Sequence, residues 1–78
     1  MEVDMSRQGQ HVVPSERGWS VRKAGSSRAT SNHATQQEAV TAATALARNQ
    51  RTELYIHGHD GRIRERRSYA SDPRQPAG

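Results

Sequence analysis

The stretch from Glu53 to Tyr69, ELYIHGHDGRIRERRSY, constrains the fold more than any other part of the chain. Asp60 and Gly61 stand between two segments in which apolar and polar residues alternate. An Asp-Gly pair in this setting is among the strongest short-range signals for a β-hairpin, because glycine accepts the positive φ that a tight turn requires. The sequence therefore predicts two antiparallel strands joined at this pair.

The length of the loop decides which side chains of the hairpin share a face, because side chains alternate along a strand. A two-residue loop places His59 opposite Arg62, and a four-residue loop over 58–61 places Ile56 opposite Ile63. We favour the four-residue loop because it pairs two isoleucines across the strands. A three-residue loop would break the resulting division into faces, since a slip by one residue moves every side chain across the sheet.

Both even-numbered loops predict the same two faces. The inner face carries the aliphatic side chains and two charged residues near its end, namely Leu54, Ile56, Ile63, Glu65 and Arg67. The outer face is aromatic and basic and carries Tyr55, His57, Arg62, Arg64 and Arg66. The hairpin is thus predicted to turn one face toward a core and the other toward solvent.

Further strands are predicted before the hairpin. Residues 11–14 and 19–23 are short apolar or alternating segments on either side of a turn. In the second segment Trp19 points inward, and as the largest apolar group of the chain it is predicted to be buried, the alternative being a platform on which a base stacks. Residues 28–31 form either a third strand or an extended loop.

One amphipathic helix is predicted from Gln36 to about residue 50. Thr35-Gln36-Gln37-Glu38 matches a capping box, in which the Thr35 hydroxyl accepts from the Glu38 backbone N–H and the Glu38 carboxylate reaches back to Thr35. Apolar residues then recur at spacings of three and four, at Ala39, Val40, Ala43, Leu46 and Ala47. Because this stripe is mostly alanine, the helix is expected to lie close to the sheet and to end near Asn49.

The predicted fold class is α+β, a small antiparallel sheet in the order strand, strand, optional third strand, helix, strand, strand, with the helix packed on one face. A single domain is expected over 10–70, between a flexible N-terminal segment, 1–9, and a disordered tail, 71–78, rich in proline and small polar residues. The 78 residues include no phenylalanine and no cysteine, so the core is thin and a homodimer would extend it.

Composition limits the classes of function. Lys and Arg number 12 against 8 Asp and Glu, and the formal net charge of +4 suits an anionic partner such as nucleic acid or an acidic protein. The absence of cysteine excludes disulfides and cysteine-based zinc sites. No apolar run approaches the ~20 residues of a membrane span and the N-terminus is polar, so a cytoplasmic protein without membrane contact is expected.

The string His57-Gly58-His59-Asp60 is the most site-like cluster for a metal, because both imidazoles share a face of a strand and Asp60 adds a third ligand. A closed site normally needs about four ligands, and no further ligand follows from the spacing. The alternative is a turn in which Asp60 bonds to nearby backbone. We therefore predict no metal and no cofactor.

Catalysis is not expected. The chain has no cysteine, and its serines lie in predicted turns without a nucleophile motif. Its carboxylates have structural explanations, since Glu38 belongs to the cap while Glu53 and Glu65 fit cross-strand charge pairs. The sequence predicts a protein that is not an enzyme.

The outer face of the hairpin is the better candidate for function. Its arginines at every second position lie about 6.6 Å apart, so each can meet a phosphate, and its two rings can stack on bases. The alternative is a charged surface that keeps a small sheet soluble and blunts pairing at its edge. Arg22 joins this surface if the two hairpins share a sheet, and the candidate contact residues are Arg22, Tyr55, His57, Arg62, Arg64 and Arg66.

Several short strings resemble a known bacterial family in their order and spacing. They are His11-Val12-Val13-Pro14, Gly18-Trp19-Ser20-Val21, Thr35-Gln36-Gln37-Glu38-Ala39, Ile56-His57 with Asp60-Gly61-Arg62-Ile63, and Ser68-Tyr69. Over residues 10–73 the chain resembles the small bacterial family catalogued as domain of unknown function 2188 (DUF2188). The resemblance implies a small stand-alone domain with one helix on a sheet, and it implies neither an activity nor any site residue.

Two functions from different classes follow. The first is a non-enzymatic bacterial interaction module that binds a protein partner or a second copy of itself through its sheet. The alternative is non-specific nucleic-acid binding through the basic outer face of the hairpin. Salt separates the two, because phosphate binding weakens steeply with ionic strength while an apolar protein contact depends on it far less.

Overall fold

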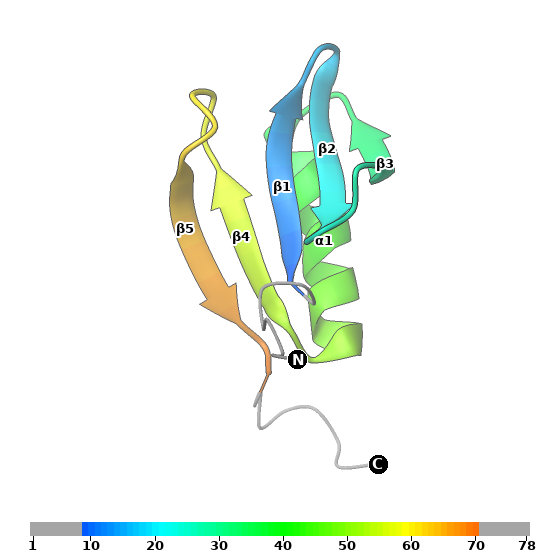
Figure 1. The fold of residues 1–78 in the computed structure, drawn as a ribbon, viewed down its shortest axis with the longest axis vertical. Coiled ribbons are helices and arrows are strands. Elements are labelled where there is room, and N and C mark those ends of the chain that lie inside the picture. Colours follow the sequence, from blue (N-terminus) through cyan, green and yellow to red (C-terminus); the bar gives the residue numbers. More distant parts are fainter. Residues whose placement is uncertain (1–8, 71–78) are drawn as a thin grey trace.

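The computed structural model describes residues 9–70, which form one five-stranded sheet and one helix (Figure 1). The elements in chain order are β1 (Gln10–Ser15), β2 (Gly18–Lys23), β3 (Ala29–His33), α1 (Gln36–Gln50), β4 (Glu53–His57) and β5 (Ile63–Ser68). This order confirms the predicted α+β class and shows that the third strand is present. The segments predicted to be flexible, 1–9 and 71–78, lie outside the described residues apart from Gly9.

The sheet is mixed, with the strand order β3-β2-β1-β4-β5. Neighbouring strands are antiparallel except for β1 and β4, which run parallel with Gln10 opposite Leu54 and Val12 opposite Ile56. A parallel pair requires a crossover connection, and α1 provides it. As a result, β1 and β4 lie side by side although more than half of the domain separates them in sequence.

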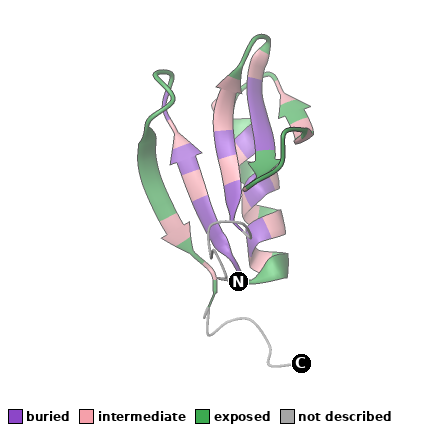
Figure 2. Ribbon diagram, viewed as in Figure 1, coloured by how far each residue is buried: buried purple, intermediate pink, exposed green. Residues whose placement is uncertain are grey.

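Helix α1 packs on one face of the sheet, here called the helix face, and no described element covers the opposite, open face (Figure 1). Figure 2 shows how burial alternates along β1 and β4, whereas most of β5 is exposed. The buried apolar side chains come from the strands and from the alanine stripe of the helix: Val12, Trp19, Val21, Leu54, Ile56, Ala39, Ala43 and Ala47. Within residues 9–70, no helix is both long and apolar enough to cross a membrane.

The helix begins and ends where predicted, at Gln36 and Gln50, and only the residue that closes it differs from the prediction. The Thr35 hydroxyl accepts from the Glu38 backbone N–H at 3.1 Å, while the Glu38 carboxylate accepts from Ala34 N–H at 3.3 Å, one residue before the predicted donor. Gln36 donates from its side-chain amide to the His57 carbonyl at 3.1 Å, which ties the first turn of α1 to the end of β4. Arg51 takes the left-handed conformation that closes the helix, rather than Asn49.

The hairpin turns through a three-residue loop, so both predicted loop lengths are wrong. Gly58 N–H donates to the Arg62 carbonyl at 2.8 Å and its own carbonyl accepts from Gly61 N–H at 2.9 Å, leaving residues 59–61 as the loop. Gly61 has φ = 83°, the left-handed conformation that such loops place at their last residue. His57 therefore lies opposite Ile63, and Ile56 does not.

A β-bulge then restores the register that a two-residue loop would have produced. Ile56 pairs with Glu65, so Arg64 is an extra residue in β5 without a partner on β4. Beyond the bulge, Glu65 and Arg67 lie on the helix face and Arg66 on the open face, as predicted. Ile63, predicted on the inner face, lies opposite His57 on the open face and is 53% exposed.

Candidate functional site

Pairing across four strands aligns four side chains on the open face, here called the cross-strand row. Arg22 on β2 lies opposite His11 on β1, His11 opposite Tyr55 on β4, and Tyr55 opposite Arg66 on β5. Adjacent strands are about 4.8 Å apart, so the Cα atoms of the two arginines are separated by roughly 14 Å. The row has a cation at each end and two aromatic rings between them.

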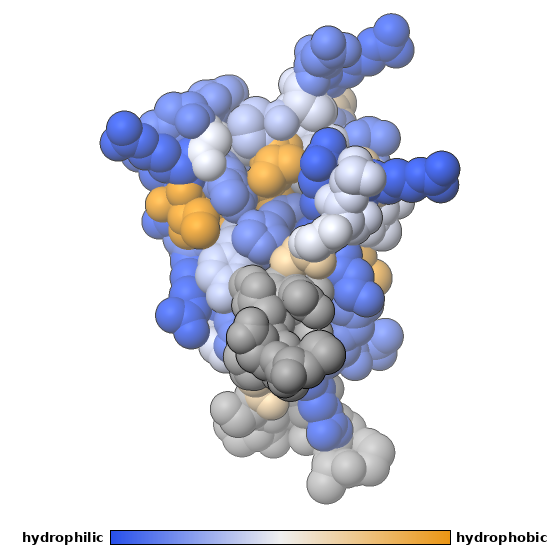
Figure 3. Space-filling view, viewed as in Figure 1, coloured by the Kyte–Doolittle hydropathy of each residue, from blue (hydrophilic) through white to orange (hydrophobic). Residues whose placement is uncertain are grey.

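The next row on the same face is mainly uncharged. It runs across all five strands through Asn32, Ser20, Val13, His57 and Ile63. Ser20 donates to Asn32 Oδ1 at 2.6 Å, which satisfies its buried hydroxyl within the fold. Figure 3 shows the open face with small apolar patches in a hydrophilic surround.

Three rings from β1 and β4 form one cluster. His11 stacks on Tyr55 with 4.8 Å between ring centroids, and its Nδ1 lies 2.9 Å from His57 Nε2. His57 Nδ1 lies 2.8 Å from the Gly61 carbonyl oxygen. Because a carbonyl only accepts, the contacts assign the proton of neutral His57 to Nδ1, and its Nε2 then accepts from Nδ1–H of His11.

The ring of Tyr55 is in contact with other residues of the domain. One face of its ring carries His11, and Gly9 abuts its edge so closely that a Cβ at residue 9 would lie 2.9 Å from Tyr55 Cε2. The His57 ring is held at both nitrogens. These rings therefore hold the open face together, which favours contact with a ligand through the flanking charges over base stacking.

The charges at the two ends of the cross-strand row have no ionic partner in the part of the chain that the structure describes. Within residues 9–70, neither Arg22 nor Arg66 forms an ion pair, and both are exposed. Arg22 also borders two hollows of the open face, one lined in part by Val13, Ser20 and Asn32 and the other by His11, Val13, Lys23 and the turn at 24–26. The open face thus offers cations next to concave surface.

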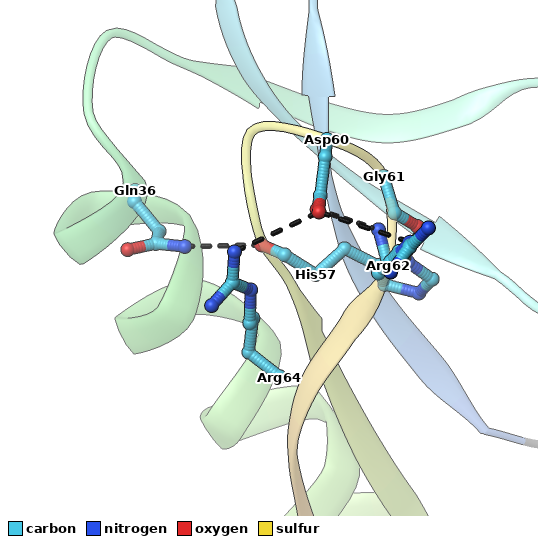
Figure 4. Close-up of polar contacts among 6 residues, drawn as sticks. All are labelled: Gln36, His57, Asp60, Gly61, Arg62 and Arg64. Atoms are coloured by element: carbon cyan, nitrogen blue, oxygen red, sulfur yellow. Dashed lines mark hydrogen bonds and ion pairs between the residues drawn. The ribbon is translucent and has the colours of Figure 1, made fainter.

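Arg62 and Arg64 do not extend this arrangement, although the sequence predicts both on the same face as Arg66. Arg64 lies against buried Gly58, where a Cβ would be 2.7 Å from its Nε, and residue 58 continues the helix-face positions of β4. Figure 4 shows the Arg64 side chain beside Gln36 of α1. Its Nη2 lies 3.6 Å from Asp60 Oδ2, and Arg62 Nε lies 3.9 Å from the same oxygen. Both arginines therefore belong to the hairpin tip and share one carboxylate.

The charges on the helix-face side of β5 are paired with each other. Arg67 donates from Nε to Glu65 Oε2 at 2.6 Å, and this hydrogen bond raises the pKa of the Arg67 guanidinium. Of the arginines in β5, only Arg66 is therefore left available to a ligand on the open face.

The histidines and aspartate considered as metal ligands do not converge. His57 lies on the open face, whereas His59 packs edge-on against Trp19, a helix-face residue, with 5.0 Å between ring centroids. Asp60 accepts from the backbone N–H of Arg62 at 3.0 Å, as the turn alternative requires. Within residues 9–70, no group of three or more potential metal ligands is present.

His11 is the residue of the cross-strand row that the sequence did not select. The sequence placed His11 in a predicted strand, but it did not show which residues of other strands lie next to it. Nothing in the string at 11–14 indicates which strand pairs with it in the sheet. The preference of helix crossovers for parallel neighbours could have suggested that the strand after α1 pairs with an earlier one. It would not have identified β1 as that strand.

His11 also makes the stability of the fold depend on pH. Burial, and then the charge of nearby His57, lower the pKa of His11 below its ordinary 6.5. Just below that pH the unfolded chain binds more protons than the folded one, so the free energy of unfolding falls as the pH falls through this window.

We expect His11→Gln to make the free energy of unfolding depend less on pH, as measured in urea melts recorded on both sides of the window. His59→Gln, in the exposed loop, serves as the control, and parallel pH profiles for unsubstituted chain and His11→Gln would contradict the assignment.

Comparisons with known proteins identify the family. The model of the family described as an uncharacterized protein conserved in bacteria (DUF2188) matches residues 10–69. This range covers every helix and strand of the domain. No curated protein and no solved structure matches the chain significantly.

Proposed function

We propose, for a chain that belongs to the bacterial family DUF2188, that it is a non-enzymatic cytoplasmic module that binds double-stranded nucleic acid without reading its sequence. The cross-strand row carries this proposal. It places two exposed arginines, Arg22 and Arg66, on either side of an aromatic centre on a face that no described element covers. Neither arginine forms an ion pair with another residue of 9–70. Cations with no internal partner are the groups that neutralise phosphates and release counterions.

The width of the sheet supports contact with the backbone rather than with bases. Five strands at about 4.8 Å spacing span roughly 19 Å, whereas the major groove of B-DNA is about 12 Å wide and admits a helix or a two-stranded ribbon. The open face as a whole cannot enter such a groove. Phosphate contacts position a protein on the duplex but carry no sequence information directly. Binding that is independent of sequence follows.

The chemistry of the face supports binding rather than catalysis. His11 and His57 are hydrogen-bonded to each other and to the backbone, and Ser20 is bonded to Asn32. Glu53 is buried, and its carboxylate accepts from Ser68 at 3.2 Å. No carboxylate or nucleophile on this part of the described chain stands ready beside a base in a deep pocket.

The salt dependence of duplex binding tests the proposal. Each neutralised phosphate contributes about −0.9 to the slope of log K against log salt concentration, so contacts by two arginines give a slope of about −1.8 or steeper. The measurement is fluorescence anisotropy of a labelled mixed-sequence duplex between about 50 and 200 mM salt, with protein up to about 100 μM, since non-specific dissociation constants fall in that range. A second duplex of unrelated sequence is expected to bind equally well.

Two results would reject the proposal. One is the absence of any anisotropy change at the lowest salt concentration. The other is strong preference for one duplex sequence, because a face that contacts only phosphates has no means of discriminating bases.

A protein partner or a second copy of the chain is the other candidate, and the exposure of Ile63 on the open face favours it. Ile63 is the only large apolar side chain in residues 9–70 that is exposed, at 53%. An apolar contact centred on this residue would persist at high salt. Association of the chain that is undiminished between about 50 and 200 mM salt, together with no binding to duplex, would favour this candidate.

A further inference from the structure

The His11–His57 pair has one free position for a proton. His57 Nδ1–H is directed at the Gly61 carbonyl, and His57 Nε2 accepts from His11 Nδ1–H. His11 Nε2 makes no hydrogen bond within residues 9–70, and it is not among the polar atoms sealed from solvent without a partner. A proton added there leaves both hydrogen bonds of the pair intact.

A second proton does not fit. It would occupy His57 Nε2 and bring two N–H groups face to face across 2.9 Å, with a positive charge on each ring. The pair therefore takes up at most one proton while both of its hydrogen bonds persist.

Burial, and then the neighbouring His57, oppose this proton in the free protein. Arg22 lies beside His11 on β2, and Arg66 lies opposite Tyr55 on β5. Glu53, on the open face of β4 two residues before Tyr55, is the acidic group nearest in register, and it is bonded to Ser68. An anion held by Arg22 next to His11 would favour the charged pair.

The structure holds a place for such an anion. The hollow is lined by His11, Arg22 and Lys23 and by the turn at 24–26, and Arg22 is the cation that shares the open face with His11. We propose that this hollow is a proton-linked phosphate subsite, in which a backbone phosphate binds to Arg22 and the His11–His57 pair takes up one proton. The inference rests on the proposed function and adds that the affinity for duplex depends on pH.

The test compares affinities for one duplex between about pH 6 and pH 8 at constant ionic strength, where backbone phosphodiesters do not titrate. Uptake of one proton permits at most about a tenfold gain in affinity per pH unit as the pH falls. We expect a clear gain for the unsubstituted chain and for His59→Gln. His11→Gln, which removes the nitrogen that takes up the proton, is expected to bind with little dependence on pH.

A second measurement does not depend on variants that fold poorly. Calorimetric titration of the unsubstituted chain with duplex, in two buffers of different ionisation enthalpy, counts the protons taken up on binding, and we expect a value between zero and one that vanishes at high pH. Binding of duplex with no proton uptake and no pH dependence would overturn the subsite and leave the proposed function standing. No binding at any pH would overturn both.

Discussion

Replacing Arg22 and Arg66 together with glutamine is expected to weaken duplex binding about sixtyfold at about 0.1 M salt. Two phosphate contacts contribute about −1.8 to the slope of log K against log salt concentration. At about 0.1 M salt their contribution to K is therefore about 0.1 to the power −1.8, which is roughly sixtyfold. The slope itself should become less steep by the same amount. The measurement is the anisotropy titration of a labelled duplex at several salt concentrations.

The matched control is Arg62→Gln with Arg64→Gln, which removes the same charge from the same molecule. These side chains are exposed, at 86% and 67%, but they share Asp60 at the hairpin tip and lie away from the cross-strand row. We expect affinity within about threefold of the unsubstituted chain, because distant exposed charges are screened. Circular dichroism establishes that both double variants are folded.

The comparison separates the location of the charge from its amount. Equal weakening by the two double variants would mean that net charge alone attracts the duplex. Stronger weakening by the substitutions at 62 and 64 would assign binding to the hairpin tip, in line with the arginine row predicted from sequence, and would contradict the open-face interface.

The sequence correctly predicted those structural elements that are determined by contacts between residues close together in the chain. The capping box at Thr35 lies within four residues, and the reversal at Asp60-Gly61 depends on the backbone freedom of one glycine. The alternation around Trp19 likewise predicted which face of β2 is buried. In each case the residues that decide the structure are neighbours in the chain.

The faces of β5 were harder to predict because two irregularities act in opposite directions. The three-residue loop shifts the register by one residue, and the bulge at Arg64 shifts it back. Alternation alone therefore places Arg66 correctly and Ile63 and Arg64 on the wrong faces. A bulge opposite Ile56 has no sequence signal as strong as Asp-Gly, since arginine is neither a turn former nor a glycine.

The candidate site depended on the one contact that no local pattern encodes. Parallel pairing of β1 with β4 brings His11 to Tyr55 and His57 and completes a row between Arg22 and Arg66. Four of the six predicted contact residues lie on this face, while Arg62 and Arg64 belong to the tip. Long-range strand pairing is selected by packing of the whole sheet against α1, and a periodicity within one strand does not contain that information.

Trp19→Ala is expected to remove most of the stability of the domain. Trp19 is 6% exposed in a core whose helix contributes only alanines as fully buried side chains, so no large neighbour can fill the space it leaves. Truncation of a buried Trp costs about 3–5 kcal/mol. Native domains have only about 5–15 kcal/mol in total, and small ones lie near the lower end. Circular dichroism during thermal and urea unfolding measures the loss.

Trp19→Phe is the control, because it keeps an aromatic ring in the same space and loses part of the volume. We expect a smaller loss and a cooperative transition, since contact with the edge of His59 and with the helix is partly kept. A loss of about 3 kcal/mol or more corresponds to a fall in melting temperature of at least about 12 °C in a domain of this size. If Trp19→Ala instead melted within a few degrees of the unsubstituted chain, the ring would not be the centre of the core. The helix would then be held to the sheet mainly by its alanines and by the partly buried Val40 and Leu46, and not by the ring of Trp19.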